Sequence, residues 1–291
     1  MRYIIYLIFT QLAGLLPLKV LHVLGDCLGE LIWIFSSSRR RYSIQAVSQR
    51  LGIPRKQART IARKSFRNSG RSFLEILYSR DDYRFLHESV HIPDMQTVNS
   101  MRHTTRPIVF ACAHFGGWEL LSSIIILLMQ EKTGKGVVRL PKDRNLAEIM
   151  LHLRSKSKIK MVPHRHSAPE ILRHLRGGGL AGFLADHNCS RSEAIFLSFL
   201  GKKAAVNIGP ALLAVRSEAI VWPVFLLRLP GQRYRLISAE PLDTRTLHGN
   251  RREKIEKCAQ YYTHAIAEMV KKHPEQWFWM HKRWKTRPKD E

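Results

Sequence analysis

The chain is short of acidic residues and has no paired cysteines. Among its 291 residues, 48 are Lys or Arg and 23 are Asp or Glu, which gives a formal net charge of +25. The cysteines, Cys27, Cys112, Cys189 and Cys258, are widely spaced and form no CxxC motif. The sequence therefore suggests neither a disulfide framework nor a zinc site, and it fits a reducing compartment. The basic excess predicts an anionic partner, which could be nucleic acid, anionic lipid or an acidic protein.

The sequence also has no internal repeat and no low-complexity linker. Hydrophobic residues make up 45% of it, so a core can be buried. From residue 106 onward, short runs rich in Val, Ile and Phe alternate with longer helical patterns. This alternation predicts an α/β fold whose mixed, mainly parallel sheet is flanked by helices.

The pattern assigns individual elements along the chain. We expect strands at residues 107–113, 135–140, 159–162, 179–186, 219–229 and 233–242. We expect helices at residues 43–52, 54–79, 118–132, 144–156, 168–178, 209–218 and 250–277.

The N-terminal region is mostly apolar up to residue 35. A signal peptide fits poorly, because the apolar stretch is too long and no small-residue cleavage site follows. A membrane-spanning helix is borderline, because Lys19 interrupts the uncharged stretch before the ~20 residues that a bilayer requires. The alternatives are two membrane-surface helices at 3–16 and 18–35, or a buried helix of a soluble protein.

We expect this region to associate with a membrane. The chain then divides into a membrane-associated helical segment at 1–41 and an α/β domain at 42–291. The basic cluster Arg39 to Arg41 would keep the following domain on the cytoplasmic side if the segment spans the bilayer.

The segment AHFGGWE at 113–119 places a histidine and a carboxylate five residues apart. His114 follows an expected strand, where α/β sheets carry functional groups. On one continuous helix, His114 and Glu119 would point about 140° apart, so Gly116 and Gly117 must turn the chain if they are to meet. Glu119 could then fix the imidazole tautomer and favour the imidazolium. The alternative is a structural histidine and a glutamate that only complements the helix dipole.

HFGGWE resembles the HxxxxD/E motif of glycerolipid and lysophospholipid acyltransferases. It resembles more closely the H-x-G-x-W-E motif of the lipid A biosynthesis late acyltransferase family. Other segments are similar to blocks of that family in the same order: GVVRLPKDRN at 136–145, the long segment at 184–228, and EQWFWMHKRWKTRP at 275–288. Departures from the family pattern are His187 in place of Gln, Lys203 in place of Pro and Asn207 in place of Thr.

The resemblance implies a membrane-bound enzyme that moves a fatty acyl chain from an acyl carrier protein thioester to a hydroxyl of a lipid A precursor. His114 would be the general base, and Glu119 would orient it. No metal and no cofactor other than the thioester co-substrate is expected. The oxyanion donors would be backbone N–H groups near Phe115 to Gly117, or a nearby arginine. The implied substrate-binding residues are Arg139, Asn145, Asp186, Gly116 and Gly117.

The expected partners are acyl carrier protein, a lipid A precursor or related glycolipid, and the membrane, but no nucleic acid. The expected location is the inner membrane, with the catalytic domain on its cytoplasmic side. The alternatives are an acyltransferase for another glycolipid or a lysophospholipid, and a basic membrane-binding or nucleic-acid-binding protein without catalysis. Candidate residues for an anion-attracting surface are Arg63, Lys64, Arg67, Arg71, Lys282, Arg283, Lys285 and Arg287.

Overall fold

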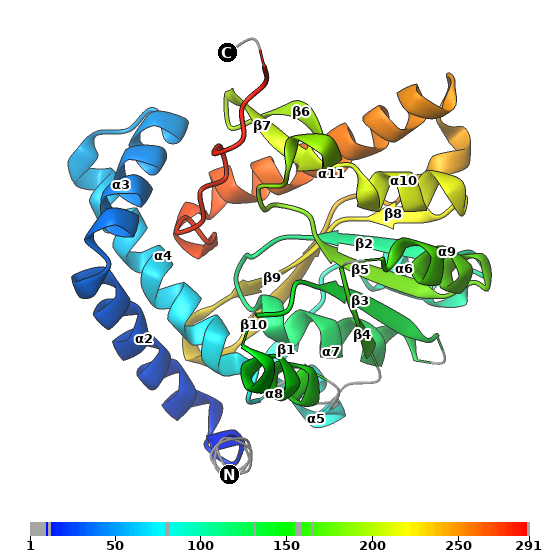
Figure 1. Cartoon of the computed structure of the whole chain (residues 1–291). Coiled ribbons are helices and arrows are strands. Elements are labelled where there is room, and N and C mark those ends of the chain that lie inside the picture. The colour runs from blue at the N-terminus through cyan, green and yellow to red at the C-terminus, as the bar shows by residue number, and fades with distance from the viewer. Residues whose placement is uncertain are drawn as a thin grey trace.

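A six-stranded, mainly parallel sheet forms the centre of the molecule (Figure 1). The computed structural model describes residues 10, 13–78, 82–130, 132–141, 143–154, 159–164 and 166–289. The strand order is β11-β8-β2-β5-β3-β4, and every neighbouring pair is parallel except β11 with β8. The strands are β2 (Ile108–Cys112), β3 (Gly134–Val138), β4 (Ile159–Pro163), β5 (Leu180–Leu184), β8 (Ile220–Trp222) and β11 (Leu242–Asp243). The predicted mixed, mainly parallel α/β sheet is thus confirmed.

Strand β2 is buried on both of its faces. Ile108, Phe110 and Cys112 join one apolar core, whereas Val109 and Ala111 join another on the opposite face. A strand covered on both sides is apolar at every position, which is why it appears in the sequence as a continuous apolar run. The covering helices are α7 (Trp118–Met129) in the first core, with α9 (Ala168–Arg176), α10 (Gly209–Arg216) and α11 (Arg251–Lys272) in the second.

The strand expected at 219–229 is in fact two strands in two sheets. Pro223 has no N–H for a ladder hydrogen bond, and the chain changes sheets at this residue. Strand β8 precedes it, whereas β9 (Val224–Arg228) follows it and belongs to a three-stranded sheet of order β1-β10-β9. The other members of that sheet are β1 (Val90–His91) and β10 (Tyr234–Ser238). The strand expected at 233–242 divides in the same way between β10 and β11.

Several elements differ from the sequence prediction. The final helix α11 ends at Lys272 instead of residue 277, because Pro274 follows closely. The helix expected at 144–156 is described as α8 (Arg144–Arg154). Elements that the sequence did not predict include the short strand β1, the short helices α5 (Tyr83–Ser89) and α6 (Met95–His103), and the antiparallel pair β6 (Ala194–Phe199) and β7 (Lys202–Asn207).

Three N-terminal helices pack against one edge of this body (Figure 1). They are α2 (Leu18–Phe35), α3 (Ser37–Leu51) and α4 (Arg55–Glu75), and α3 runs through the expected boundary at residue 41. Helices α2 and α4 touch through glycines: a Cβ atom on Gly70 would lie 2.0 Å from the carbonyl oxygen of Gly25. Only residues without a side chain allow two helix backbones to approach so closely.

Ion pairs reinforce the contact between α2 and α4. Asp26 accepts hydrogen bonds from Arg67 and Arg71, and Glu30 accepts hydrogen bonds from Arg63. Arg63, Arg67 and Arg71, which were predicted to belong to an anion-attracting surface, are therefore already paired with carboxylates of α2.

No described helix is both long enough and apolar enough to cross a bilayer. The helix expected at 3–16 lies largely outside the described residues. Because the carboxylates of α2 face α4, the outward side of α2 is mostly apolar. Its exposed large apolar side chains are Val20, Val23, Leu24, Leu31, Ile34 and Phe35, and Lys19 and Cys27 are exposed as well.

Candidate functional site

His114 and Asp186 meet at the carboxyl edge of the central sheet. Strands β2 and β5 are parallel neighbours, with Cys112 opposite Leu184. His114 and Asp186 each follow their strand end by two residues, so the register places them side by side. The Nδ1 atom of His114 lies 2.8 Å from Oδ1 of Asp186. Because a carboxylate only accepts, Nδ1 carries the proton and Nε2 is left with a lone pair.

Protein groups enclose the carboxylate of Asp186 completely. Its side chain is 0% exposed, and Oδ2 accepts the backbone N–H of His114 at 3.0 Å and the indole N–H of Trp277 at 2.8 Å. Burial raises the pKa of Asp186, but His114 more than offsets this and holds it well below its usual range. Such a carboxylate has no oxygen left for substrate, so the position fits an orienting role better than the substrate contact expected from the sequence.

The same pair sets the charge state of His114. Burial lowers the pKa of its ring, whereas the charge and hydrogen bond of Asp186, with a smaller contribution from Glu119, raise it. The raising effects are larger, so the pKa of His114 lies above its ordinary value of 6.5. An imidazolium that is easily formed suits a residue that takes a proton during a reaction.

The glycines turn the chain between β2 and α7, as the sequence predicted. Gly116 has φ +54°, and a Cβ atom there would lie 2.0 Å from the carbonyl oxygen of Leu226. The N–H groups of this turn are engaged, however. Phe115 donates to Ala113, Gly116 to Gln276 and Gly117 to Leu226. The oxyanion-donor role expected of Gly116 and Gly117 does not fit these hydrogen bonds.

Glu119 occupies the first turn of α7 but pairs with an arginine. Its carboxylate accepts Nη2 of Arg154 at 2.6 Å and Nε of Arg154 at 3.1 Å, as well as the indole N–H of Trp118 at 3.2 Å. The carboxylate at Nδ1 of His114 is therefore that of Asp186, where the sequence analysis expected Glu119. Glu119 still affects His114 through its charge, which raises the pKa of the ring.

Arg139 and Asn145 lie near this edge without joining its hydrogen bonds. Arg139 directly follows β3 and is exposed, and Asn145 lies partly buried in the first turn of α8. Among the described residues, neither side chain contacts His114, Asp186 or Glu119 through a hydrogen bond. Their substrate-binding roles stay predictions.

Aromatic rings surround the imidazole of His114. Ring centroids of Trp118, Phe278 and His187 lie 5.6, 5.8 and 6.4 Å away. The ring nevertheless keeps 26% of its surface exposed, so one side stays accessible. His187 is exposed and its Nδ1 donates to the carbonyl of Leu184 at 2.9 Å. The ring of His187 therefore presents Nε2 as an acceptor beside the site.

The C-terminal segment at 277–283 packs against the buried side of the site and contacts Asp186. Trp277 and Trp279 are each 1% exposed, so both are core residues. Trp277 binds Asp186, and His281 makes a 3.1 Å contact between its Nε2 and the backbone carbonyl of Asp186. Arg283, expected on the surface, is 1% exposed and donates to the carbonyls of His187 and Ala205.

Arg154 and the pairing of His114 with Asp186 were not predicted. Arg154 lies 35 residues from Glu119 and belongs to no motif. The sequence nevertheless contains an indication of the pairing. His114 directly follows the expected strand at 107–113, Asp186 is the last residue of the expected strand at 179–186, and no other charged residue interrupts either strand.

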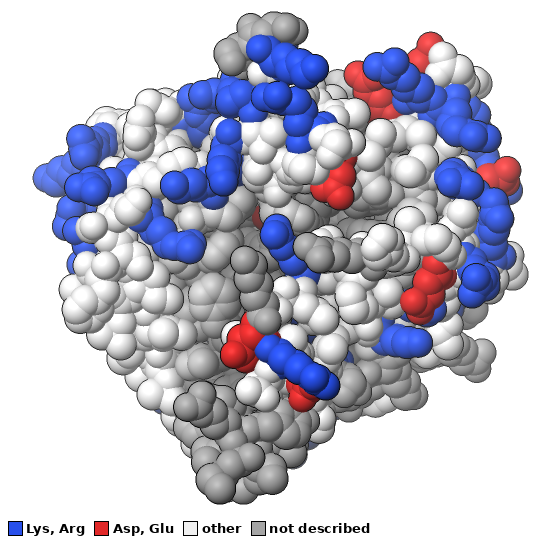
Figure 2. All heavy atoms as spheres, viewed as in Figure 1, with Lys and Arg blue, Asp and Glu red and all other residues white. Residues whose placement is uncertain are grey.

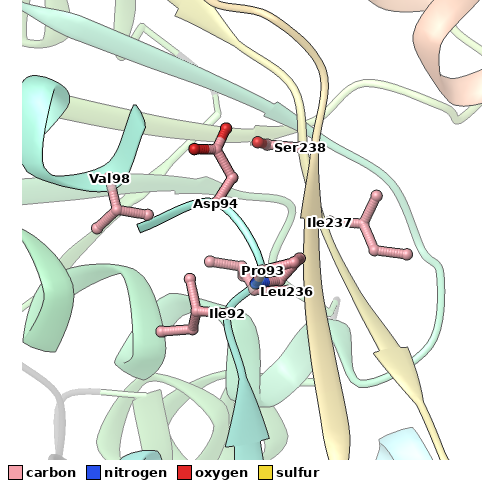
Figure 3. A pocket seen from close by; sticks show the side chains of 7 residues that line it. All are labelled: Ile92, Pro93, Asp94, Val98, Leu236, Ile237 and Ser238. Carbon is pink, nitrogen blue, oxygen red and sulfur yellow. The ribbon is translucent and has the colours of Figure 1, made fainter. Parts of the chain in front are cut away.

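One hollow away from His114, within the described part of the chain, is too small to compete as a site. It measures about 100 Å³, lies beside β10 and is lined by Ile92, Asp94 and Leu236 among others (Figure 3). Ligand pockets usually measure about 300–1,000 Å³, and Asp94 already caps α6 by accepting the N–H of Thr97. Within the described ranges, no group of three His, Cys, Asp or Glu side chains could hold a metal ion.

Comparison with known proteins gives two similarities. Residues 1–286 match the family model described as bacterial lipid A biosynthesis acyltransferase. The chain is also 25% identical over 280 residues to the lipid A biosynthesis lauroyltransferase of Escherichia coli (strain K12), which covers 94% of this chain and 88% of that protein. The resemblance inferred from the ordered motifs is thereby confirmed.

Proposed function

Because this chain belongs to the bacterial lipid A biosynthesis acyltransferases and is therefore an acyltransferase, we propose that it transfers a fatty acyl chain from acyl carrier protein to a hydroxyl of a lipid A precursor. The observation that carries the proposal is the His114–Asp186 pair, which leaves Nε2 of a partly exposed imidazole with a lone pair. A base held in this tautomer suits the deprotonation of a hydroxyl.

The proposed reaction uses His114 twice. As the hydroxyl oxygen attacks the thioester carbonyl carbon, Nε2 takes the hydroxyl proton. Asp186 keeps the ring in orientation and stabilises the imidazolium. The tetrahedral intermediate then collapses, its C–S bond breaks, and the departing thiolate receives the proton from Nε2. An ester and a free thiol are formed, and His114 is neutral again.

Arg154 is the donor that we propose for the oxyanion. The N–H groups of Gly116 and Gly117 are engaged, whereas the charge of Arg154 is close enough to lower the pKa of His114. Glu119 fixes the guanidinium of Arg154 through two hydrogen bonds. Preorganised donors of this kind stabilise developing negative charge at little reorganisation cost. Glu119 would thus act by holding Arg154 and by balancing the imidazolium, while Arg139 would contact an anionic head group.

We propose that the outward face of α2 rests on an anionic bilayer surface. Val23, Ile34 and Phe35 are 57%, 57% and 80% exposed. Figure 2 shows that the flank over α2 is nearly free of charge, while Lys and Arg gather above it, over α3 and the C-terminal segment. An apolar helix face beside basic residues is typical of interfacial binding. Co-sedimentation with anionic phospholipid vesicles should fall in Val23→Glu/Ile34→Glu, and unchanged binding would contradict this orientation.

Acyl transfer by purified protein tests the proposed function. The assay combines acyl carrier protein thioester and lipid A precursor in detergent–lipid micelles and detects the ester by mass spectrometry. Wild type should form it, and His114→Ala should lower the rate by about 10³-fold or more, as expected for loss of the general base. His103→Ala is the matched control, because His103 is exposed on α6, away from the site. Unchanged transfer by His114→Ala would contradict the base, and transfer only to a lysophospholipid would contradict the acceptor.

A further inference from the structure

A second charged cluster lies behind the glycine turn and is wholly enclosed. The side chain of Glu75, at the end of α4, is 0% exposed, and that of Arg228, at the end of β9, is 2% exposed. Nη2 of Arg228 donates to Oε1 and Oε2 of Glu75 at 2.9 and 2.8 Å, and Nε donates to Oε1 at 3.1 Å. Both side chains are buried and neither forms a hydrogen bond with His114 among the described residues, so the reaction described above does not use them directly.

The cluster ends on the backbone of the glycine turn. The carbonyl oxygen of Gly116 accepts Nη2 of Arg228 at 3.1 Å and the hydroxyl of Ser72 at 2.6 Å. Gln276 completes the arrangement. Its side chain exchanges two hydrogen bonds with the backbone of Arg228, and its carbonyl accepts the N–H of Gly116. The side chains of Arg228 and Ser72 thus hold the carbonyl oxygen of Gly116. The backbone of Gln276, whose side chain is bonded to Arg228, holds its N–H group.

The turn needs this support for a physical reason. Gly116 is in the left-handed region, and glycine loses more conformational freedom on folding than any other residue. A buried carbonyl without a donor is also unfavourable. If the donors to Gly116 were removed, its peptide would be free to rotate. His114 is only two residues away, and its ring must stay on Oδ1 of Asp186.

Helix α2 also reaches the cluster. His22 is 6% exposed, and its Nε2 lies 2.8 Å from Oε1 of Glu75 and 3.0 Å from the hydroxyl of Tyr234. Tyr234 donates to the same oxygen of Glu75 at 2.7 Å. Glu75 therefore accepts from groups on α2, β9 and β10, and it holds the guanidinium of Arg228 against the turn.

We propose that Arg228, Ser72 and Glu75 are positioning residues for acyl transfer: they hold the Gly116 carbonyl and thereby keep the imidazole of His114 aligned with Asp186. This inference rests on the proposed function, because it concerns the same histidine. A purely structural role would join α4 to β9 equally well without affecting how His114 is oriented, so the two roles predict different measurements.

Two variants test the proposal at different strengths. Ser72→Ala removes a single hydroxyl from the Gly116 carbonyl, and Arg228→Lys keeps the charge but loses the planar set of donors. Arg106→Lys is the matched control. Arg106 also pairs with a carboxylate, Asp243, and donates to a backbone carbonyl, that of Glu218, but it precedes β2 at the opposite end from His114.

In Ser72→Ala we expect kcat to fall about tenfold, because the loss of one hydrogen bond can change a rate by about that factor. KM should stay within about twofold of the wild-type value. The pH midpoint of kcat/KM should also move down toward 6.5, because a looser imidazole interacts less with Asp186. Arg228→Lys should show the same changes more strongly. Arg106→Lys should keep the wild-type kcat and the wild-type pH midpoint of kcat/KM. Each variant is measured at the same number of degrees below its own melting temperature, so that differences in stability do not affect the comparison.

A readout without catalysis separates this inference from the proposed function. The Nδ1 proton of His114 should give a low-field proton NMR resonance that disappears in His114→Ala. We expect this resonance to shift or broaden in Ser72→Ala and Arg228→Lys and to stay in place in Arg106→Lys. A wild-type protein without acyl-transfer activity would contradict the proposed function. The NMR resonance of His114 would still test whether Ser72 and Arg228 position the imidazole. Unchanged kcat, or a resonance identical in Ser72→Ala and wild type, would overturn the positioning role.

Discussion

Two carboxylates of the described residues, Asp186 and Glu75, are 0% exposed and paired with a basic side chain, and the His114–Asp186 and Arg228–Glu75 pairs differ in which atoms they leave free. In the His114–Asp186 pair, the imidazole side chain is 26% exposed, and its Nε2 atom is not bonded to the carboxylate. In Arg228–Glu75, each nitrogen of the guanidinium donates to a protein acceptor. A pair with a spare, accessible atom can act on substrate, whereas a pair whose atoms are all engaged can only hold other groups in place.

The difference also shows in the energetic consequences of a substitution. Removing one partner of a buried ion pair leaves an uncompensated charge, which is strongly destabilising. Changing the tautomer of a catalytic histidine mainly affects the rate. Substitutions at Asp186 should therefore lower mainly the rate, whereas substitutions at Arg228 should lower both the stability and the rate.

The largest effect should come from Asp186→Asn. Oδ2 of Asp186 accepts two N–H groups, from His114 and Trp277, so the asparagine oxygen should stay there and its NH₂ group should face Nδ1. The imidazole would then carry its proton on Nε2 and no longer act as a base. We expect kcat to fall about 10³- to 10⁴-fold, measured in the acyl-transfer assay. A fall of less than tenfold with an unchanged melting temperature would contradict the orienting role.

Next in size is the effect of Arg228→Met on stability. Glu75 would remain buried without its counter-charge, and we expect the free energy of unfolding to fall by about 3–5 kcal/mol. Urea unfolding monitored by tryptophan fluorescence measures this loss. A loss below about 1 kcal/mol, within the range of ordinary substitutions, would show that water or another group compensates Glu75.

The pH dependence of stability gives an independent check on Glu75. Burial raises the pKa of Glu75, but Arg228 and His22 more than offset this, so it lies below its ordinary value of 4.5. A lowered folded-state pKa contributes stability that is present above pH 4.5 and is lost as the pH falls through the folded-state pKa. Glu75→Gln should remove this part of the acid dependence.

Glu119→Gln should have a smaller effect than Asp186→Asn. The tautomer of His114 stays correct, but Arg154 loses the carboxylate that fixes it, and we expect kcat to fall about 10²-fold. Because the base must be neutral, kcat/KM of wild type should rise with pH through a midpoint above 6.5. Glu119 raises the pKa of His114, so this midpoint should move down in Glu119→Gln. A larger loss than in Asp186→Asn would reverse the ranking of the two carboxylates.

The smallest effect should be that of His187→Gln. The protein groups packed around the ring of His187 reduce its hydration and lower its pKa although part of the side chain is exposed, so the ring is neutral near pH 7 and the substitution changes no charge. A glutamine amide can also donate to Leu184 and leave an acceptor facing outward. We expect kcat/KM within about twofold of wild type and the same pH midpoint. A shifted midpoint would mean that His187 contributes to the charge state of His114.

The fold could be predicted where burial dictates the pattern of residues. Strand β2 was recognisable because both of its faces are covered, and α7 because its apolar run follows two glycines. The break at Pro223 was hidden by apolar residues on both sides, since both sheets bury them equally. The β6–β7 pair was missed because short antiparallel strands such as KKAAVN carry little periodicity.

The site could be predicted only where its residues are close in sequence. His114, Gly116 and Glu119 stand out because one short segment contains them. Asp186 lies 72 residues from His114, and Arg228 lies 153 residues from Glu75. Such pairings depend on strand order and helix packing, which a single sequence does not determine. The motif therefore predicted the candidate base, His114, whereas the carboxylate at its Nδ1 could be found only from the sheet register.

The equal distance of His114 and Asp186 from their strand ends restricts how the chain length can vary. An extra residue after Cys112 or after Leu184 would shift one member of the pair by about 3.3 Å along its strand direction. Because successive residues alternate sides, it would also turn that side chain toward the opposite face. Insertions and deletions should therefore be tolerated in the exposed loops elsewhere, but not between Cys112 and His114 or between Leu184 and Asp186.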